Sequence, residues 1–293
     1  MAAVVQHSCT DSYEENLAAS VKGIEKAAAK NADLVLLPEL STAPYFCITE
    51  NPDNYDLAES IPGMTSETLS KLAKQHQIII VTTLFEKRAK GIYHNTAIVL
   101  DKDGSLAGTY RKMHIPDDPG FYEKYYFTPG DQGFIPIETS IGRLGVLICW
   151  DQWYPEAARI MALSGAEILL FPSAIGWEPA ESEDEKERQQ NAWITIQQSH
   201  AIANNLPVIV SNRIGLEEIN NSEPQSILFW GSSFIADQQG DTLAKATVED
   251  ECVIMTELDL DKTEQVRRVW PYFRDRRIEH YDGILKRHID DTK

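Results

Sequence analysis

Residues 145–151 read Gly145-Val146-Leu147-Ile148-Cys149-Trp150-Asp151, and they join an apolar run to a segment with helical spacing. The run from 144 to 148 is typical of a buried strand, whereas residues 156–163 carry apolar side chains at helical intervals. A strand that enters a helix through a tight turn places the turn residue at the carboxyl edge of a sheet, where ligands of open α/β sheets bind. We therefore expect Cys149 at such an edge, either as a nucleophile or as a small apolar residue that ends a buried strand.

The composition predicts an ordinary soluble globular protein. Of the 293 residues, 43% are hydrophobic and 25% are charged. Residues 1–6 lack the basic and apolar regions of a signal peptide, and no stretch reaches the ~18 apolar residues of a membrane span. The net charge of −18 disfavours nucleic acid and favours a cationic small molecule, although it also serves solubility. We therefore expect a cytoplasmic protein with no membrane or nucleic-acid partner.

The four cysteines are widely spaced and form neither a CxxC pair nor a zinc-binding pattern with histidine. This spacing favours free thiols in a reducing compartment. Apart from Cys149, they are expected to be small buried apolar residues, namely Cys9, Cys47 and Cys252. No metal site is predicted.

Strands and helices alternate along the chain, which predicts a single α/β domain over residues 1–293. Ser12 and Glu15 have the pattern of a capping box for a helix over about 13–29, between strands at 2–6 and 33–39. Further strands are predicted at 78–85, 94–100, 105–114, 144–148, 167–173, 207–212, 227–236, 242–246 and 252–258, and further helices at 65–75, 156–163 and 189–204.

Three segments are predicted to lie outside this pattern or at its end. The acidic residues 178–187 are interpreted as a surface loop. The strands from 227 onward are expected to form an antiparallel end of the sheet. A helix from about 262 begins a tail rich in arginine and aromatic residues, for which subunit contacts are one interpretation.

Three polar residues lie where predicted strands end, and they are Glu39, Lys112 and Cys149. A carboxylate can take the proton of a thiol and later return it to a leaving amine. A nearby ammonium favours the thiolate and stabilises the oxyanion of a tetrahedral intermediate. These residue types suffice for amide hydrolysis without a metal or cofactor, although spacing alone would also allow other glutamates and lysines.

The segments around these residues resemble the three signature blocks of the nitrilase superfamily, in the same order and spacing. The blocks are Leu37-Pro38-Glu39-Leu40, Tyr110-Arg111-Lys112-Met113-His114 and Ile148-Cys149-Trp150-Asp151. The resemblance extends over about 4–281 and implies an α/β fold built as a four-layer α-β-β-α sandwich. It implies that Glu39 is the general base, Lys112 the oxyanion and orientation partner, and Cys149 the nucleophile, with no cofactor. It further implies a supporting glutamate, Glu123, and a homo-oligomer.

Longer segments resemble the branch of this superfamily that hydrolyses N-carbamoylputrescine to putrescine, ammonia and carbon dioxide. They are residues 117–131, 151–159 and 211–215. The substrate of that branch ends in a primary ammonium, which needs an acidic or aromatic partner. Asp151 and Glu178 are predicted as that partner, and Trp150 as a residue that shapes the oxyanion site and pocket. Asp151 and Glu178 could instead cap a helix or be solvated, and Trp150 could pack under the turn.

Three alternatives remain open at this point. A sister amidase for N-carbamoyl-β-alanine, another N-carbamoyl amino acid or an ω-amide would need a cation such as Arg213 for the substrate carboxylate, although Arg213 could also pair with an acidic residue. A non-catalytic relative would bind a partner or a small molecule, which the joint presence of the three triad residues disfavours. A cysteine–histidine hydrolase would use His114 or His200 as its base.

Overall fold

Strand β1 (Ala2–Gln6) is buried on both faces in the computed structural model, which describes residues 1–219 and 225–289. Val4 belongs to an apolar cluster that also contains residues of a second sheet, such as Val208. The next residue, Val5, packs in a different cluster with Ile24 and Leu69 from the helices on the outer face. This alternation explains the continuous apolar run, because both faces of the strand need apolar side chains.

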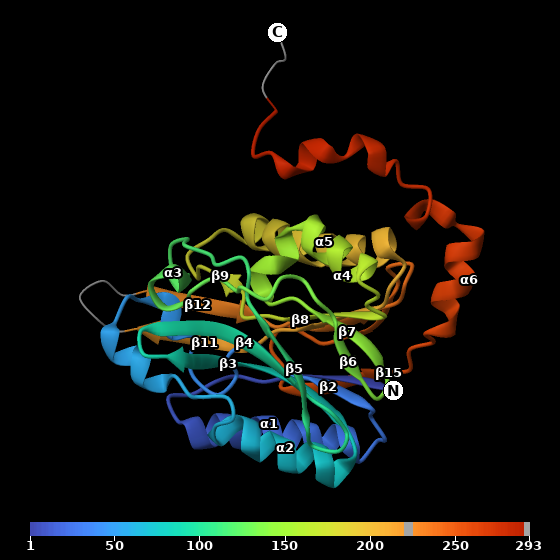
Figure 1. Ribbon diagram of the computed structural model, residues 1–293. Coiled ribbons are helices and arrows are strands. Elements are labelled where there is room, and N and C mark those ends of the chain that lie inside the picture. The colour runs from blue at the N-terminus through green and yellow to red at the C-terminus, as the bar shows by residue number, and fades with distance from the viewer. Residues whose placement is uncertain (220–224, 290–293) are drawn as a thin grey trace.

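Figure 1 shows two sheets packed face to face and covered on their outer sides by helices, so the four-layer α-β-β-α sandwich is confirmed. The first sheet has the order β15-β1-β2-β3-β4-β5 and the second β14-β13-β10-β8-β7-β6. The first comprises β1, β2 (Leu34–Leu36), β3 (Ile79–Ala89), β4 (Ile92–Leu100), β5 (Leu106–Arg111) and β15 (Cys252–Thr256). The second comprises β6 (Ile137–Thr139), β7 (Gly142–Val146), β8 (Ile168–Pro172), β10 (Val208–Ser211), β13 (Phe234–Ala236) and β14 (Thr242–Lys245).

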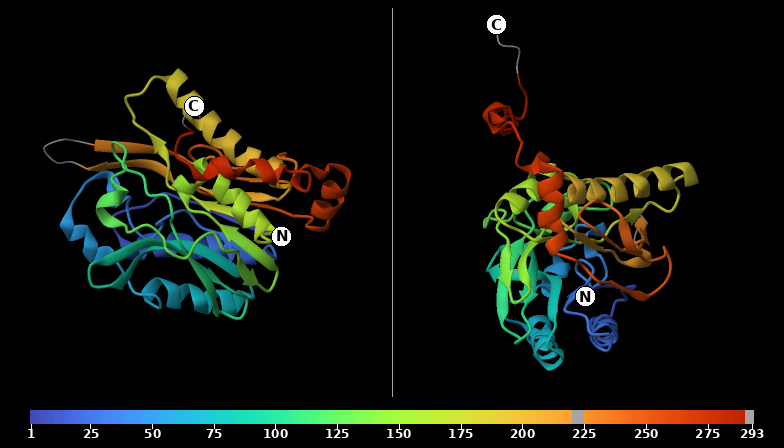
Figure 2. Two further views of the ribbon diagram at one scale, coloured as in Figure 1. Left: turned by 45° about the horizontal axis from the view of Figure 1, so that its top comes forward. Right: turned by 90° about the vertical axis from the view of Figure 1, so that its right-hand side faces the viewer.

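Helices α1 (Tyr13–Ala28) and α2 (Met64–His76) pack on the outer face of the first sheet, and α4 (Pro155–Leu163) and α5 (Glu183–Asn204) on that of the second (Figures 1 and 2). The short α3 (Glu123–Tyr126) lies in a loop, α6 (Asp261–Val269) lies at the side of the sandwich, and a small third sheet extends the sandwich at one end. The third sheet is formed by β9 (Gly176–Trp177), β11 (Ile214–Ile219) and β12 (Gln225–Trp230), in the order β11-β12-β9. Short 3-10 turns occur at η1 (Phe46–Ile48), η2 (Pro52–Leu57), η3 (Cys149–Trp153), η4 (Pro271–Phe273), η5 (Ile278–His280) and η6 (Asp282–Leu285).

The strands after residue 212 differ from the prediction. Residues 214–219 form β11, which was not predicted, and the strand predicted at 227–236 is divided into β12 and β13. Gly231 and Ser232 both have positive φ, at 50° and 55°, and such a backbone cannot continue a strand. The predicted antiparallel end of the sheet is confirmed for β13 and β14, which pair antiparallel beside β10. It is wrong for β15, which pairs antiparallel with β1 in the first sheet.

The acidic segment is helical rather than a loop from residue 183 onward. Ser182 caps α5 by accepting a hydrogen bond from the backbone N–H of Glu185. Glu183, Asp184 and Glu185 occupy the first turn, where negative charge is stabilised by the helix dipole. A cluster of acidic residues therefore indicated a helix start here.

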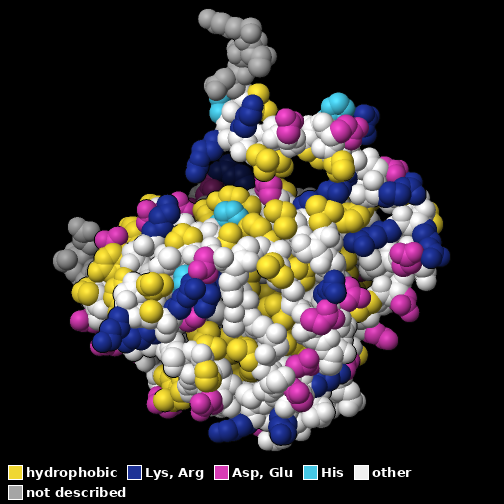
Figure 3. All heavy atoms as spheres, viewed as in Figure 1, with side chains coloured by type: hydrophobic (Ala, Val, Ile, Leu, Met, Phe, Trp, Pro, Cys, Tyr) yellow, Lys and Arg dark blue, Asp and Glu magenta, His cyan; other side chains and the backbone are white. Residues whose placement is uncertain are grey.

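Beyond α6 the chain extends away from the two sheets, as Figures 1 and 2 show. Apolar side chains of this segment are exposed, among them Ile284 at 63% and Leu285 at 89%. Figure 3 shows hydrophobic side chains gathered on the face of the body below this segment. Within residues 1–219 and 225–289, no helix is both long and apolar enough to cross a membrane.

Candidate active site

Cys149 lies three residues beyond the end of β7 and begins the turn η3, as the strand–turn–helix pattern predicts. Its φ of 41° lies in the left-handed region, which is uncommon for residues other than glycine and marks a sharp reversal of the backbone. The side chain is 5% exposed and lines a cavity. Its Sγ donates to the carbonyl of Ala174, with 3.8 Å between sulfur and oxygen. The first backbone N–H groups of such a turn have no acceptor inside it, so they remain available to a bound group.

Asp151 holds this turn in place and does not line the cavity. Its Oδ2 accepts hydrogen bonds from the Tyr110 hydroxyl at 2.7 Å and from the backbone N–H of Ile148 at 3.0 Å. Its Oδ1 accepts from the backbone N–H of His114 at 3.0 Å and lies 2.7 Å from His114 Nδ1. The prediction that Asp151 contacts substrate is therefore corrected. Its fully buried carboxylate ties the Cys149 turn to the segment that follows Lys112.

Lys112 is fully buried between two carboxylates. Its Nζ lies 2.8 Å from Glu39 Oε1, 2.9 Å from Glu123 Oε1 and 2.7 Å from Glu123 Oε2. Glu39 follows β2 and Lys112 follows β5 in the first sheet, whereas Glu123 begins α3 in the long aromatic loop. The structure thus brings together three of the residues that the sequence predicted, from positions 73 and 11 residues apart.

The two oxygens of Glu39 have different surroundings. Oε1 accepts from Lys112 and from Asn95 Nδ2, the latter at 2.7 Å. Oε2 is buried and has no hydrogen-bond partner within the described part of the chain. A buried oxygen without a partner costs free energy, so it is available to a substrate, a water molecule or a proton. Asn95 gave no signal in the sequence, because nothing distinguishes an inward-facing asparagine of a strand from a packed one.

The charges in this cluster act on one another. Burial lowers the pKa of Lys112, but Glu123 and Glu39 outweigh burial and hold this pKa well above its usual value. Burial raises the pKa of the Cys149 thiol well above its usual value, Glu39 raises it further, and Lys112 opposes them. These surroundings favour the thiol over the thiolate, so a base is needed to activate the sulfur. Burial also raises the pKa of Glu123 to about 7, against the opposing effect of Lys112.

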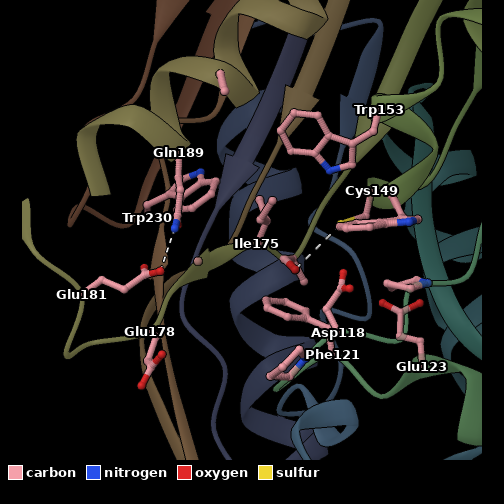
Figure 4. Close-up of a pocket in the computed structure, with 16 residues that line it drawn as sticks. Asp118, Phe121, Glu123, Cys149, Trp153, Ile175, Glu178, Glu181, Gln189 and Trp230 are labelled. Carbon is pink, nitrogen blue, oxygen red and sulfur yellow. Dashed lines mark hydrogen bonds between the residues drawn. The ribbon is translucent and has the colours of Figure 1, made fainter. Parts of the chain in front are cut away.

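A cavity of about 480 Å³ opens in front of Cys149. Figure 4 shows Cys149 and Glu181 on opposite sides of it, with Ile175 between them and Trp153 and Trp230 on the wall. The described residues that line the cavity include four acidic side chains but no Lys, Arg or His, and the acidic ones are Asp118, Glu123, Glu178 and Glu181. An acidic wall with aromatic side chains suits a cationic group.

Trp150 and Glu178 both line the cavity, as the sequence prediction required of them. Glu178 is exposed at the rim, whereas Glu181 is only partly exposed. Glu181 Oε1 accepts from Gln189 Nε2 at 2.7 Å, and its Oε2 is buried without a partner in the described residues. The prediction of a solvated loop placed Glu181 outside the site. Glu181 lies within the predicted loop 178–187, and the sequence gave no indication of which way its side chain points.

The residues named by the alternative predictions, Arg213, His114 and His200, do not line the cavity. Arg213 pairs with Glu217 at 2.8 Å, so the second interpretation of Arg213 is the observed one. His200 is buried against the carbonyl of Gln152, with 2.7 Å from Nε2 to oxygen, and His114 contacts Asp151.

Of the remaining cysteines Cys47 is buried, but the other two, Cys9 and Cys252, are partly exposed, contrary to the prediction.

The family model for carbon-nitrogen hydrolases matches residues 1–268. The chain belongs to this family, the nitrilase superfamily, and is a hydrolase of carbon–nitrogen bonds other than peptide bonds. It is 41% identical to the N-carbamoylputrescine amidase of Solanum lycopersicum, over 97% of this chain and 94% of that protein. It is 43% identical to the citrullinase of Francisella tularensis subsp. tularensis, over 98% of both. The crystal structure of a carbon-nitrogen hydrolase from Helicobacter pylori G27 matches with a TM-score of 0.95 and 54% identity, over 98% of this chain and 99% of that one.

Proposed function

We propose that this protein hydrolyses N-carbamoylputrescine, with Cys149 as nucleophile, Glu39 as general base and Lys112 as oxyanion partner. The charge of the cavity wall is the observation from which we choose this substrate. Four carboxyl side chains and no cationic side chain line the wall that the structure describes, so it favours a substrate with an ammonium end. The names of the relatives at about 41% identity support the same substrate.

In the first step, Glu39 takes the thiol proton of Cys149 while Sγ attacks the ureido carbonyl carbon. Glu39 Oε2 is suited to this task because it has no hydrogen-bond partner among the described residues, whereas Oε1 is held by Lys112 and Asn95. The carbonyl oxygen becomes an oxyanion, stabilised by Lys112 Nζ and by the backbone N–H of Trp150. Donors of this kind contribute about 10²–10³-fold each to the rate of acyl transfer.

In the second step, Glu39 returns the proton to one of the two ureido nitrogens, and the bond from that nitrogen to the carbonyl carbon breaks. The remaining carbamoyl group is bound to Sγ as a thiocarbamate. A water molecule then gives a proton to Glu39 and attacks the carbonyl carbon. The C–S bond breaks, Sγ leaves as a thiolate that takes this proton back from Glu39, and a carbamic acid remains. Its decomposition completes the balance, in which one N-carbamoylputrescine and one water give putrescine, ammonia and carbon dioxide.

The outer end of the cavity holds the substrate ammonium in this proposal. Glu181 is the principal partner, because its Oε2 is buried and without a partner in the described chain, and Gln189 fixes its other oxygen. Glu178 lies at the rim of the same wall and attracts the cation as it enters. Trp230 and Trp153 add apolar and aromatic surface for the methylene chain between the two ends.

Citrulline is the second candidate substrate, because one relative at 43% identity is named citrullinase. Citrulline carries the same ureido group, but its far end bears a carboxylate beside the ammonium. An acidic wall without a cationic partner would disfavour that carboxylate by repulsion and desolvation. Ammonia release should therefore give a higher kcat/KM for N-carbamoylputrescine than for citrulline, N-carbamoyl-β-alanine or an ω-amide. A higher kcat/KM for any carboxylate-bearing compound would overturn the proposal.

We also propose that a second copy of this chain covers the exposed apolar side chains of the C-terminal segment. Ile284 and Leu285 are 63% and 89% exposed, an unfavourable arrangement for a monomer in water. Light scattering should show a dimer or larger assembly for the wild-type protein, and a smaller species when Leu285 is replaced by Asp. The exposed Leu106 of β5 is the matched control, and Leu106→Asp should leave the mass unchanged. A monomeric wild-type protein would contradict this proposal.

A further inference from the structure

The buried ion pair between Arg213 and Glu217 lies behind the proposed base, and the steps above do not use it. Arg213 follows β10, and Glu217 lies on β11. Arg213 is fully buried and Glu217 is 8% exposed, with 2.8 Å from Nη1 to Oε1. Burying two charges costs several kcal/mol unless further hydrogen bonds satisfy them. What these two side chains hold besides each other is therefore informative.

Arg213 holds the backbone of the proposed base. Its Nη2 donates to the carbonyls of Glu39 at 2.7 Å and Leu40 at 2.9 Å, and its Nη1 donates to the carbonyl of Ala43 at 3.2 Å. Leu40 has a φ of 49°, a conformation that is unfavourable for leucine and persists only when its surroundings enforce it. A guanidinium bound to two successive carbonyls fixes the two peptide planes. It therefore fixes the direction in which the Glu39 side chain leaves the backbone.

Glu217 reaches the second carboxylate through a tyrosine. Its Oε2 accepts from the backbone N–H of Tyr45 at 2.5 Å, and the hydroxyl of Tyr45 donates to Glu123 Oε1 at 2.6 Å. Tyr45 is 1% exposed, and the Arg213 guanidinium lies 6.0 Å from the centre of its ring. One ion pair is thus connected to both carboxylates that bind Lys112.

We infer that Arg213 and Glu217 are positioning residues that set both carboxylates around Lys112, Glu39 through its backbone and Glu123 through Tyr45. Neither side chain lines the cavity, so they act through the groups that they hold. The inference rests on the proposed roles of Glu39 and Cys149. On this inference the ion pair controls how accurately Glu39 is placed beside Cys149, and it does not control the affinity for substrate.

Glu217→Gln tests this, because it keeps the shape of the side chain and removes the charge that holds Arg213 and Tyr45. We expect kcat to fall about 10- to 100-fold while KM stays within about twofold, since the substrate contacts other residues. The rate at which iodoacetamide alkylates Cys149, followed by mass spectrometry, reports on activation of the thiol by Glu39 without any substrate. In Glu217→Gln this alkylation rate should fall together with kcat.

Tyr45→Phe keeps the ion pair and removes only the hydroxyl that donates to Glu123. This hydrogen bond lowers the pKa of Glu123, so its loss should move the acid limb of the pH profile of kcat/KM to higher pH. Glu264→Gln is the matched control, because it removes the partner of an exposed pair, Glu264 and Arg268, with the same spacing of four residues and the same 2.8 Å distance. It should leave kcat, alkylation and pH profile unchanged.

A folded Glu217→Gln protein with a lower melting temperature but unchanged kcat and alkylation rate would show a merely structural pair and overturn the inference. If that variant does not fold, Tyr45→Phe decides, and an acid limb at the wild-type position overturns the inference. A wild-type protein that fails to hydrolyse N-carbamoylputrescine overturns the proposed substrate instead. In that case the alkylation rates of the wild type and of Glu217→Gln would test the inference.

Discussion

The two ends of the cavity differ in how their charges are satisfied. At the inner end, Cys149 and Glu123 line the cavity, and behind them Lys112 binds both Glu123 and Glu39. Glu39, Lys112 and Glu123 are each 1% exposed or less. At the outer end, Glu178 is exposed and Glu181 is partly exposed, and neither forms an ion pair that the structure of residues 1–219 and 225–289 records. The inner end is a fixed charge cluster, while the outer end is acidic surface that a cation can enter.

This difference indicates a division of labour. A pre-formed, water-excluded cluster stabilises charge that develops during the reaction, because its dipoles and charges need no rearrangement. Partly solvated carboxylates contribute less to the rate, since water screens them, but they select substrates by the charge of the far end. Changes at the inner end should therefore lower kcat, and changes at the outer end should alter KM and substrate preference.

The largest expected effect is that of Cys149→Ala. It removes the attacking atom from the inner end, so turnover should fall by about 10⁴-fold or more, as when other covalent nucleophiles are removed. Circular dichroism and the melting temperature should remain close to those of the wild type, because the side chain is small. Residual activity near the wild-type level would contradict the nucleophile assignment and favour another mechanism.

Glu39→Gln should have the next largest effect. It keeps the size of the side chain and a hydrogen-bond acceptor for Lys112, but it cannot take the thiol proton, so kcat should fall about 10²- to 10⁴-fold. The pH profile of the remaining activity should follow direct ionisation of Cys149, whose pKa burial raises well above its usual value, and should therefore rise toward high pH. His114→Ala and His200→Ala are the controls, and a loss in either that equals Glu39→Gln would favour a cysteine–histidine mechanism.

Glu123 should produce an intermediate effect that depends on pH. Burial raises its pKa to about 7, so the carboxylate becomes protonated as the pH falls through that value. Lys112 would then lose its charged contact with Glu123 and would bind Glu39 more tightly, which leaves Glu39 less able to take the thiol proton. We expect an acid limb near pH 7 in kcat/KM, and in Glu123→Gln a flat profile at a level about 10- to 100-fold lower. An acid limb that persists unchanged in Glu123→Gln would rule out this assignment.

Most of the inner end was predictable from the sequence, whereas of the outer carboxylates only Glu178 was. The strand–turn pattern at Cys149 and the three strand-end residues depend on local spacing, so a single sequence reveals them, and the family blocks select among the candidates. Asp151 was predicted to face the substrate because local sequence cannot show whether a carboxylate turns toward a cavity or toward its own backbone. Glu181 was assigned to solvent for the same reason. The contact of Arg213 with the Glu39 carbonyl joins residues 174 positions apart, which no local pattern encodes.

The smallest expected effect belongs to the outer end. Glu181→Gln should raise KM for N-carbamoylputrescine about tenfold and leave kcat nearly unchanged, because one hydrogen bond to a charged group is lost far from the reacting carbon. The same variant should narrow the gap in kcat/KM between N-carbamoylputrescine and citrulline, since the repulsion of a carboxylate decreases with the charge of the wall. Glu187→Gln is the matched control, because Glu187 is an exposed glutamate of α5, the helix that begins two residues after Glu181, and does not line the cavity. An equal rise in KM for both variants would attribute the effect to net charge, and a fall in kcat without a change in KM would place Glu181 with the inner end.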